Sequence, residues 1–509
     1  MNRTQRFVRG FSIGYAQLVL TTLAGLWLTP FFLHALGQDG YGLWLVGTQV
    51  LAYLLLLDFG VIALLPREVA YATGRALTGT PETHLRQLTE DAFGLALAQT
   101  PLVALAAFAT LLWLPATWTP LRWPLTIVLA VLVATFPFRS YHAILVGLQD
   151  LAFAARVQLV AWMVGTALAV GLVWRGVGLS ALAAGWCATQ VISIGVCAWR
   201  LRTAHGHAMP WRPALRMARA KSYLGSSLWV SLGQIAQALL NGADLLIVGA
   251  LLGPRAVVPF ACTGKLLDVL ANQPQGMLQA AQPALSELRS SAAAPRLFDV
   301  SSALAQATMA LSGLIACVVL AIDPGFVGWW VGPDQFAGFR VMVLLVVEML
   351  VRHLNTTHVY ALFCFGHERR LAVTAIVDGV VSVAVGALLI RWIGLAGAPL
   401  GSIVGATLVS LPANTLAFAR DTQSPPGRFL SMLAPWAVRL AAAAAACVAG
   451  GVWFRGASFP VLALIGASAV TLYLSMAAPA VMRSRAGVYL QPYLAPLLNR
   501  WPVPGVRSG

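Results

Sequence analysis

The fold of this chain is decided by residues 227–282, which read SLWVSLGQIAQALLNGADLLIVGALLGPRAVVPFACTGKLLDVLANQPQGMLQAAQ. The stretch is apolar enough to cross a bilayer twice, yet polar residues recur along it in steps of three and four. The first series is Ser227, Ser231, Gln234, Gln237, Asn241 and Asp244, and the second is Lys265, Asp268, Asn272, Gln275, Gln279 and Gln282. Such steps keep side chains on one face of an α-helix, so we predict two helices with one polar stripe each.

These stripes need water or a polar partner. An Asp or Lys at the centre of a bilayer costs roughly 2.5–3.5 kcal/mol on insertion scales. The amides and hydroxyls could serve to hold packed helices together by hydrogen bonds. Because both stripes run unbroken along consecutive helices, we favour a water-filled chamber inside the membrane.

The composition of the chain is that of a protein embedded in a lipid membrane. Of 509 residues, 59% are hydrophobic and only 10% are charged, and the mean hydropathy is +0.79. We predict an all-α integral membrane protein with about 14 transmembrane helices. The expected spans are 11–33, 41–65, 92–114, 124–147, 157–175, 177–199, 223–252, 256–282, 298–322, 338–363, 371–390, 395–419, 430–453 and 461–482. The first is too long for a signal-peptide core and reads as an uncleaved span.

The basic residues give the expected orientation. The net charge is +16, and with the N-terminus inside about 23 of the 33 basic residues fall in cytoplasmic segments, most densely in the loop 200–221. Both termini are therefore expected in the cytoplasm. The positive charge then serves topology and contact with anionic lipids rather than nucleic-acid binding.

The loops expected outside argue against a membrane enzyme. They are short, and their acids are Asp39, Asp323 and Asp334, each beside Gly or Pro and expected to form a turn. The sequence holds no P-loop, no Ser/His/Asp arrangement and no metal-ligand spacing, and its six cysteines fall in apolar segments. We expect a transporter without cofactor or metal, driven by an ion gradient or by the gradient of its substrate.

The chain divides into two related halves. Identities such as Leu36-Gly37 with Leu252-Gly253, and His142 with His358, recur at an offset of about 216 residues in the same span order. We expect parallel repeats, with a substrate path between two six-helix lobes. The expected domains are an N-terminal lobe 1–199, a basic cytoplasmic linker 200–222, a C-terminal lobe 223–419, an extra helix pair 420–482 and a cytoplasmic tail 483–509.

Several motifs resemble those of a known family. Residues 36–44, LGQDGYGLW, resemble the opening of the polysaccharide (Wzx-type) flippases, and Asp58-Phe59-Gly60 followed by PREVA at 66–70 resembles the end of their second span. In the second half, DLLIVG at 244–249 and Leu252-Gly253 resemble their seventh span and the turn after it. These flippases form the polysaccharide transport branch of the MOP superfamily, which also contains the MATE exporters and the lipid II flippases.

The resemblance implies a location in the bacterial inner membrane and a V-shaped pair of lobes. These lobes would move an oligosaccharide linked to undecaprenyl diphosphate, such as an O-antigen repeat unit, to the outer leaflet by alternating access. The resemblance also implies that spans one, two, seven and eight meet at the central chamber. The thirteenth and fourteenth spans would accommodate the lipid tail, and the polymerase and export machinery are possible partners.

The substrate so implied suggests roles for particular residues. A diphosphate needs fixed cations when it leaves water, and the candidates are Arg352, Lys265 and Arg139. The amides expected to bind the substrate are Gln234, Asn241, Asn272, Gln275 and Asn355. Those of the two polar stripes are expected to hydrogen-bond sugar hydroxyls. The candidates for ion coupling are Glu348, Asp244, Asp268 and Asp58.

Structural roles compete with these assignments. Lys265 with Asp268, and Glu348 with Arg352, are three and four residues apart and could simply neutralise each other. Arg139 could extend to the headgroups.

Other functions also compete. A drug or cation antiporter of the same fold would favour acidic residues and an aromatic cavity. A lipid II flippase differs only in its sugar, and a membrane glycosyltransferase or polymerase would need larger outside loops.

Overall fold

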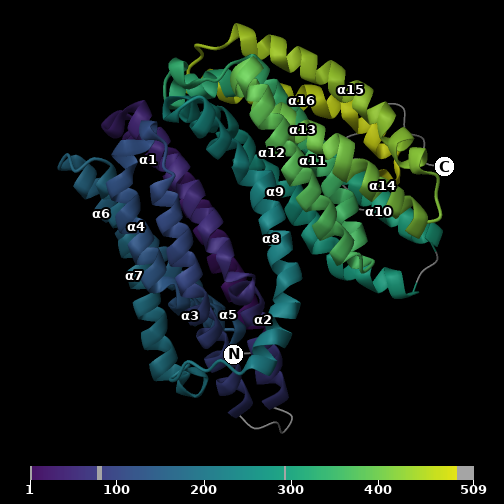
Figure 1. The fold of residues 1–509 in the computed structure, drawn as a ribbon. Helices are drawn as coiled ribbons and strands as arrows, with labels where there is room; N and C mark the ends of the chain where they lie inside the picture. The colour runs from purple at the N-terminus through teal and green to yellow at the C-terminus, as the bar shows by residue number, and fades with distance from the viewer. Residues whose placement is uncertain (1–2, 77–82, 292–293, 490–509) are drawn as a thin grey trace. The chain divides into compact units, whose positions relative to one another are not determined.

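The computed structural model describes residues 3–76, 83–291 and 294–489. Within these ranges it describes the side chains of residues 20–74, 84–216, 231–240, 242–282, 285–289 and 294–489. The regular structure of this part of the chain is helical throughout. The expected all-α membrane fold is confirmed (Figure 1).

The chain forms two compact units, Met1–Val258 and Pro259–Gly509. The first contains α1 (Arg3–Leu55), α2 (Val61–Ala76), α3 (Thr83–Leu112), α4 (Thr119–Thr135), α5 (Arg139–Gly147), α6 (Leu151–Trp174), α7 (Leu179–Ala204) and α8 (Met217–Leu251). The second contains most of α9 (Pro254–Ser291), then α10 (Ala294–Trp330), α11 (Phe339–Cys364), α12 (Glu368–Ile393), α13 (Gly397–Gly405), α14 (Leu411–Asp421), α15 (Pro426–Trp453) and α16 (Phe459–Met482). Helix α8 thus groups with the first unit, and the domain boundaries expected from the sequence stay a prediction.

Within the described residues, nine helical segments are long and apolar enough to cross a membrane. Two of them, Leu20–Asp58 and Glu368–Asp421, each cover most or all of two expected spans. The first is broken at Gly37, whose φ of 73° is a left-handed conformation that suits glycine. The hydroxyls of Thr29 and Tyr41 lie 3.3 Å apart across this break, although a straight helix would separate their backbones by about 18 Å. The chain therefore reverses direction at Gly37, as two spans require.

Three helices that carry predicted spans are not among the nine. They are α8, whose parts Ser231–Leu240 and Gly242–Leu251 are bent by 51° and pass only as a pair, and α9 and α11. These helices carry the two polar stripes and the charged residues of the tenth span. Most of the candidate residues therefore lie on helices that are bent or less apolar than the other spans.

Each unit contains a helical hairpin closed by a histidine and an aspartate. The hairpins are α6–α7 and the segment from α12 to α14, and the two stretches have equal length. In the first, His205 Nε2 lies 3.5 Å from Asp150 Oδ2, and in the second His367 Nε2 lies 2.6 Å from Asp421 Oδ2. The acid precedes the first hairpin and ends the second, so the two contacts are the same with the partners exchanged. This is what two diverged copies of one unit would retain.

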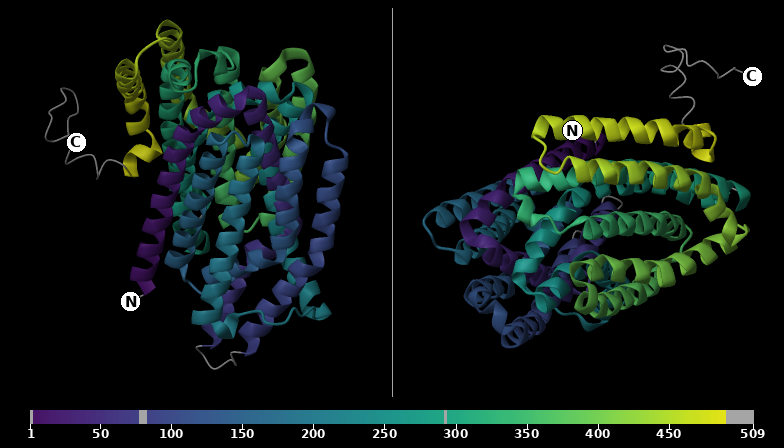
Figure 2. Two further views of the ribbon diagram at one scale, coloured as in Figure 1. Left: turned by 90° about the vertical axis from the view of Figure 1, so that its left-hand side faces the viewer. Right: turned by 90° about the horizontal axis from the view of Figure 1, so that it is seen from above.

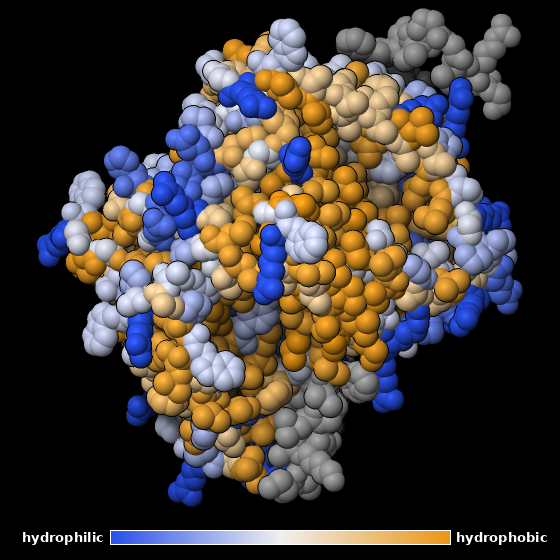
Figure 3. All heavy atoms as spheres, turned by 45° about the horizontal axis from the view of Figure 1, so that its top comes forward, coloured by the Kyte–Doolittle hydropathy of each residue, from blue (hydrophilic) through white to orange (hydrophobic). Residues whose placement is uncertain are grey.

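The helix ends suit the two interfaces of a membrane. Of eight described tryptophans that are more than half exposed, six lie at or beside helix ends on the side expected to be outside: Trp113, Trp123, Trp174, Trp329, Trp392 and Trp453. The other two are Trp199, near the end of α7 on the side expected to be inside, and Trp27 within α1. Tryptophan concentrates where a membrane meets water. Between such ends, apolar side chains form broad areas on the face shown in Figure 3.

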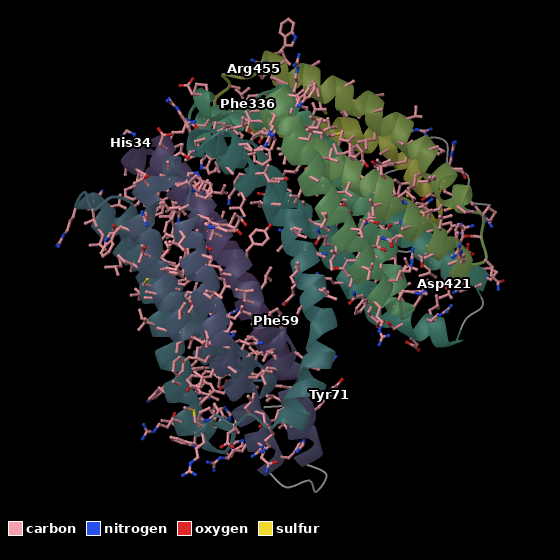
Figure 4. The ribbon with its side chains drawn as sticks, in the orientation of Figure 1. His34, Phe59, Tyr71, Phe336, Asp421 and Arg455 are labelled. Carbon is pink, nitrogen blue, oxygen red and sulfur yellow. The ribbon has the colours of Figure 1, made fainter. Side chains whose placement is uncertain are left out.

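Four of the residues labelled in Figure 4 mark opposite ends within each unit. His34 lies at one end of the first unit and Tyr71 at the other, while Arg455 and Asp421 lie at opposite ends of the second. This is the arrangement that alternating spans produce. The chain is a multi-pass membrane protein.

Helices α15 and α16 lie side by side and both pack against α10 (Figure 2). Tyr473 of α16 is almost fully buried and donates a hydrogen bond to the carbonyl oxygen of Ala310, while Trp436 Nε1 donates to the Tyr473 hydroxyl at 2.9 Å. The extra pair is thus held to the second unit by a polar contact inside an apolar core.

One expectation from the sequence is wrong. Asp323 was expected in an outside turn because Pro324 follows it, but both residues lie inside α10. The Asp323 side chain is fully buried, and neither carboxylate oxygen has a hydrogen-bond partner among the described residues. A proline within a packed membrane helix is tolerated where neighbouring helices compensate for the lost backbone hydrogen bond, so here Asp-Pro does not mark a turn.

Candidate functional site

The polar stripe of α9 lies opposite its apolar face. Asp268 and Asn272 are exposed and Lys265 and Gln275 are half-buried, whereas the leucines and the proline on the other side of the helix are buried. The buried residues are Leu267, Pro274, Leu278 and Leu285. The charges of Lys265 and Asp268 are close enough to interact, as expected for residues three apart. The helix therefore anchors to the second unit by its apolar side and leaves its amides and charges accessible.

The stripe of α8 lies near the second half of α1. Gln234 and Asp244 are half-buried, and Tyr53 of α1 donates a hydrogen bond to the carbonyl oxygen of Ala238 at 2.9 Å. The side chain of Gln49, one turn before Tyr53, approaches Gly242 of α8. Gln49 and Tyr53 were not selected from the sequence, although their spacing of four places them on one face. The side chain of Asn241 lies outside the described residues.

Asp58 and Arg139 lie in one region of the first unit. Asp58 is buried, and its Oδ1 accepts a hydrogen bond from the backbone N–H of Gly60 at 2.9 Å, where Phe59 and Gly60 both have left-handed φ angles. Arg139 is half-buried, with Nη1 3.4 Å from the carbonyl oxygen of Leu55. The Asp58 carboxylate thus stabilises the turn that ends the second span, and Arg139 contributes a hydrogen bond to the same segment.

Arg352 is the centre of a polar cluster in the second unit. Its Nη1 forms an ion pair of 2.6 Å with Oδ2 of Asp378, whose side chain is fully buried. Its Nη2 donates to the hydroxyls of Ser382 at 3.1 Å and Ser402 at 2.8 Å, and its Nε donates to Ser402 at 3.1 Å. Asp378 also accepts hydrogen bonds from Ser382 and Ser410. Every charged group of this cluster is therefore paired, as a charge inside a membrane requires.

The cluster is formed by residues of α11, of α12 and of the continuous segment made by α13 and the π-helical turn η7 (Ala406–Ser410). Arg352 comes from α11, Asp378 and Ser382 from α12, and the other serines from α13 and η7. The last residue of α13, Gly405, lies so close to α12 that a Cβ there would be 2.1 Å from the Ser382 hydroxyl. The missing side chain lets the helices approach, and short π-helical segments of this kind are frequent at functional sites.

The other candidates of α11 have different surroundings. Asn355 is buried and accepts a hydrogen bond from Asn414 of α14 at 2.9 Å, which is an interhelical contact. Glu348 is half-buried one turn before Arg352. The sequence spacing suggested Glu348 as a residue that could neutralise the charge of Arg352, whereas the structure shows an ion pair of Arg352 with Asp378.

Asp378 is the residue that sequence reasoning missed. It is the one acid in the expected span 371–390, which is otherwise apolar. An isolated acid inside a span is itself a signal, because its cost in hydrocarbon demands a partner. Pairing it with Arg352 needed the packing of α11 against α12 and α13, since 26 residues separate the two in sequence.

Comparisons with known proteins agree with this architecture. The family model described as polysaccharide biosynthesis protein matches residues 123–321. Among solved structures, a lipid II flippase, MurJ, in an inward closed conformation is similar with a TM-score of 0.54 and 8% identity, over 91% of this chain and 99% of that chain. An inward-facing MATE family multidrug resistance transporter of the MOP superfamily is similar with a TM-score of 0.51 and 14% identity, over 83% and 98%.

No curated protein matches the chain in sequence. At these identities the solved structures establish the fold, while the family model connects the sequence to polysaccharide biosynthesis. The family model therefore confirms the resemblance to proteins of polysaccharide biosynthesis over residues 123–321, and the two solved structures confirm the expected fold over most of the chain.

Proposed function

We propose that this protein translocates an oligosaccharide linked to undecaprenyl diphosphate from the inner to the outer leaflet of the bacterial inner membrane, by alternating access of its two halves. The stripe of α9 would contact the substrate. Lys265 would attract the diphosphate, while Asn272 and Gln275 would donate hydrogen bonds to sugar hydroxyls, with Gln234 and Asn241 of α8 as their counterparts.

The observation that carries this proposal is the exposed stripe of α9. Lipid would penalise exposed amides and charges in the middle of a membrane, so water or a polar substrate has to meet them. Lysine provides a compact positive charge for a diphosphate, and amides can both donate to and accept from hydroxyls. The family model, described by its link to polysaccharide biosynthesis, supports a sugar-bearing cargo.

The cluster around Arg352 favours a different role for this residue. A guanidinium whose three nitrogens already donate to Asp378 and to two serines has little left for a phosphate unless the cluster opens. We assign Lys265 the first contact with the diphosphate. Arg352 and Arg139 remain proposed ligands for a conformation in which their present contacts are exchanged, and Glu348, Asp244, Asp268 and Asp58 remain the proposed sites of ion coupling.

A depletion experiment in the native host tests the proposal. Loss of the protein should cause lipid-linked oligosaccharide to accumulate in the inner leaflet and reduce its delivery to the outer leaflet. The wild-type gene should restore delivery, Lys265→Ala should fail, Lys265→Arg should restore part of it, and Arg391→Gln, which removes an exposed charge at the end of α12, should behave as wild type.

Other outcomes would identify the competitors. Normal delivery of the oligosaccharide together with reduced efflux of a cationic dye would make the protein a drug antiporter. Accumulation of lipid II with arrested growth would make it a lipid II flippase.

A further inference from the structure

A cluster of arginines lies around a cavity in the second unit, away from the candidate residues described above. A cavity of about 610 Å³ opens between α10, the first turns of α15 and the last turn of α16. Four of its lining residues are arginines, Arg428, Arg439, Arg483 and Arg485, and no acidic side chain lines it among the described residues. It therefore concentrates positive charge at the helix ends that the orientation places on the cytoplasmic side.

Aromatic, ionic and backbone contacts hold three of these arginines in place. The guanidinium groups of Arg428 and Arg485 lie over the ring of Phe298, at 5.1 and 4.9 Å from its centre. Arg485 also forms an ion pair with Asp299, whereas Arg439 Nη1 donates to the carbonyl oxygen of Pro435 at 2.7 Å. One acid thus offsets one of the four charges, and the cavity keeps an excess of positive charge.

The chain that follows α16 closes one side of the cavity. The backbone N–H of Ala486 donates to Oε1 of Gln306 on α10 at 3.2 Å, which fixes the segment that carries Arg483 and Arg485. The rest of the wall is formed mostly by apolar residues such as Met432, Trp436 and Val481, together with the polar residues Gln306, Ser431 and Ser484. A pocket with fixed guanidiniums on one part of its wall and apolar side chains on the other matches a phosphate group attached to a hydrocarbon chain.

We propose that this cavity binds the headgroup of an anionic phospholipid of the inner leaflet, with its phosphate between the arginines. Arginine donates two parallel hydrogen bonds to phosphate oxygens. Basic pockets between membrane helices on the cytoplasmic side are suited to such headgroups, and a zwitterionic lipid would bring a cation into a site that already has excess positive charge. The bound lipid would fasten α15 and α16 to α10 and is separate from the transported cargo.

The experiment uses the full chain purified in a neutral detergent. Its melting temperature is measured against increasing phosphatidylglycerol, phosphatidylcholine or inorganic phosphate, for the wild type and for Arg439→Gln/Arg483→Gln. These two arginines are chosen because Arg428 and Arg485, which pack on Phe298, are left intact. The matched control is Arg391→Gln/Arg455→Gln, which removes the same charge elsewhere in the unit, Arg455 being at the end opposite to Asp421 (Figure 4).

Phosphatidylglycerol should raise the melting temperature of the wild type and of the control, and phosphatidylcholine should not. The double variant should need about tenfold more phosphatidylglycerol or higher for half of the effect, because charge-assisted hydrogen bonds are lost. Arg439→Lys/Arg483→Lys should respond between the two. An equal response of the double variant and the wild type would refute the site, and an equal effect of inorganic phosphate would show that a free anion rather than a lipid is bound. If the double variant does not fold, retention of phosphatidylglycerol by the lysine variant in native mass spectrometry, compared with the control, decides.

Discussion

Arg352 and Asp378 form a buried ion pair whose strength can be separated from any part in transport. Asp378→Asn and Arg352→Gln each leave a charge without its partner, which typically costs about 3–5 kcal/mol. The double variant Arg352→Gln/Asp378→Asn removes both charges and should recover much of this loss. The melting temperature of the purified protein should therefore be lower for each single variant than for the double variant.

The same variants test the role of Arg352 as a phosphate ligand. If the pair is structural, the double variant should deliver lipid-linked oligosaccharide at a rate near that of the wild type. A double variant that is as stable as the wild type yet inactive would contradict this expectation and assign Arg352, or its exchange of partners, to the transport cycle.

At the scale of elements, the contact between α12 and α13 depends on the absence of a side chain at Gly405. A Cβ at this position would lie 2.1 Å from the Ser382 hydroxyl and 2.7 Å from Oδ1 of Asp378. Gly405→Ala should therefore displace both groups and weaken the cluster around Arg352, at a cost of about 1–3 kcal/mol, as overpacking does.

Gly171→Ala is the matched control, because a Cβ at Gly171 in α6 meets no atom within 4 Å. It should leave the stability unchanged or raise it by about 0.4–1 kcal/mol. Equal melting temperatures for the two variants would mean that α12 and α13 separate easily and that the close approach is unimportant.

The stripe of α9 predicts a pattern of chemical accessibility. On a cysteine-free background, single cysteines at Asp268 and Asn272 should react with a small hydrophilic thiol reagent in membranes. Cysteines at Leu267 and Leu278, which are buried against the second unit, should react more slowly. Labelling rates measured by mass spectrometry give the comparison, and protection of both polar positions would favour the reading in which the amides hold packed helices together.

At the scale of the whole molecule, the orientation in the membrane is the property to test. From the basic residues we expect the loop 200–221 in the cytoplasm, and six exposed tryptophans lie at helix ends that are expected on the opposite side. A cysteine at Arg212 should be protected from an impermeant reagent in intact cells, whereas one at Gly332, in the turn after α10, should be labelled. Labelling at Arg212 with none at Gly332 would reverse the orientation.

The helical class, the membrane solvent and most of the spans followed from the sequence, because they depend on patterns along one dimension. Hydropathy windows located Leu151–Trp174 and Phe459–Met482 to within a few residues at their C-terminal ends. The steps of three and four in α9 predicted which face is polar, and the exposure of Asp268 and Asn272 agrees with that periodicity. These properties depend on each residue and its neighbours in sequence, so no knowledge of tertiary contacts was needed.

The partners of the buried charges were decided by tertiary packing alone. From the sequence, Glu348, one turn away, was a possible partner that balances the charge of Arg352, but the structure shows an ion pair of Arg352 with Asp378 on another helix. Asp323 was predicted to lie in a turn, although the packing of α10 keeps Asp323 and Pro324 inside a helix. The packing also places Arg439 with three other arginines around one cavity. Which side chains meet depends on the rotation and depth at which helices pack, and small residues such as Gly405 determine that packing through contacts distant in sequence.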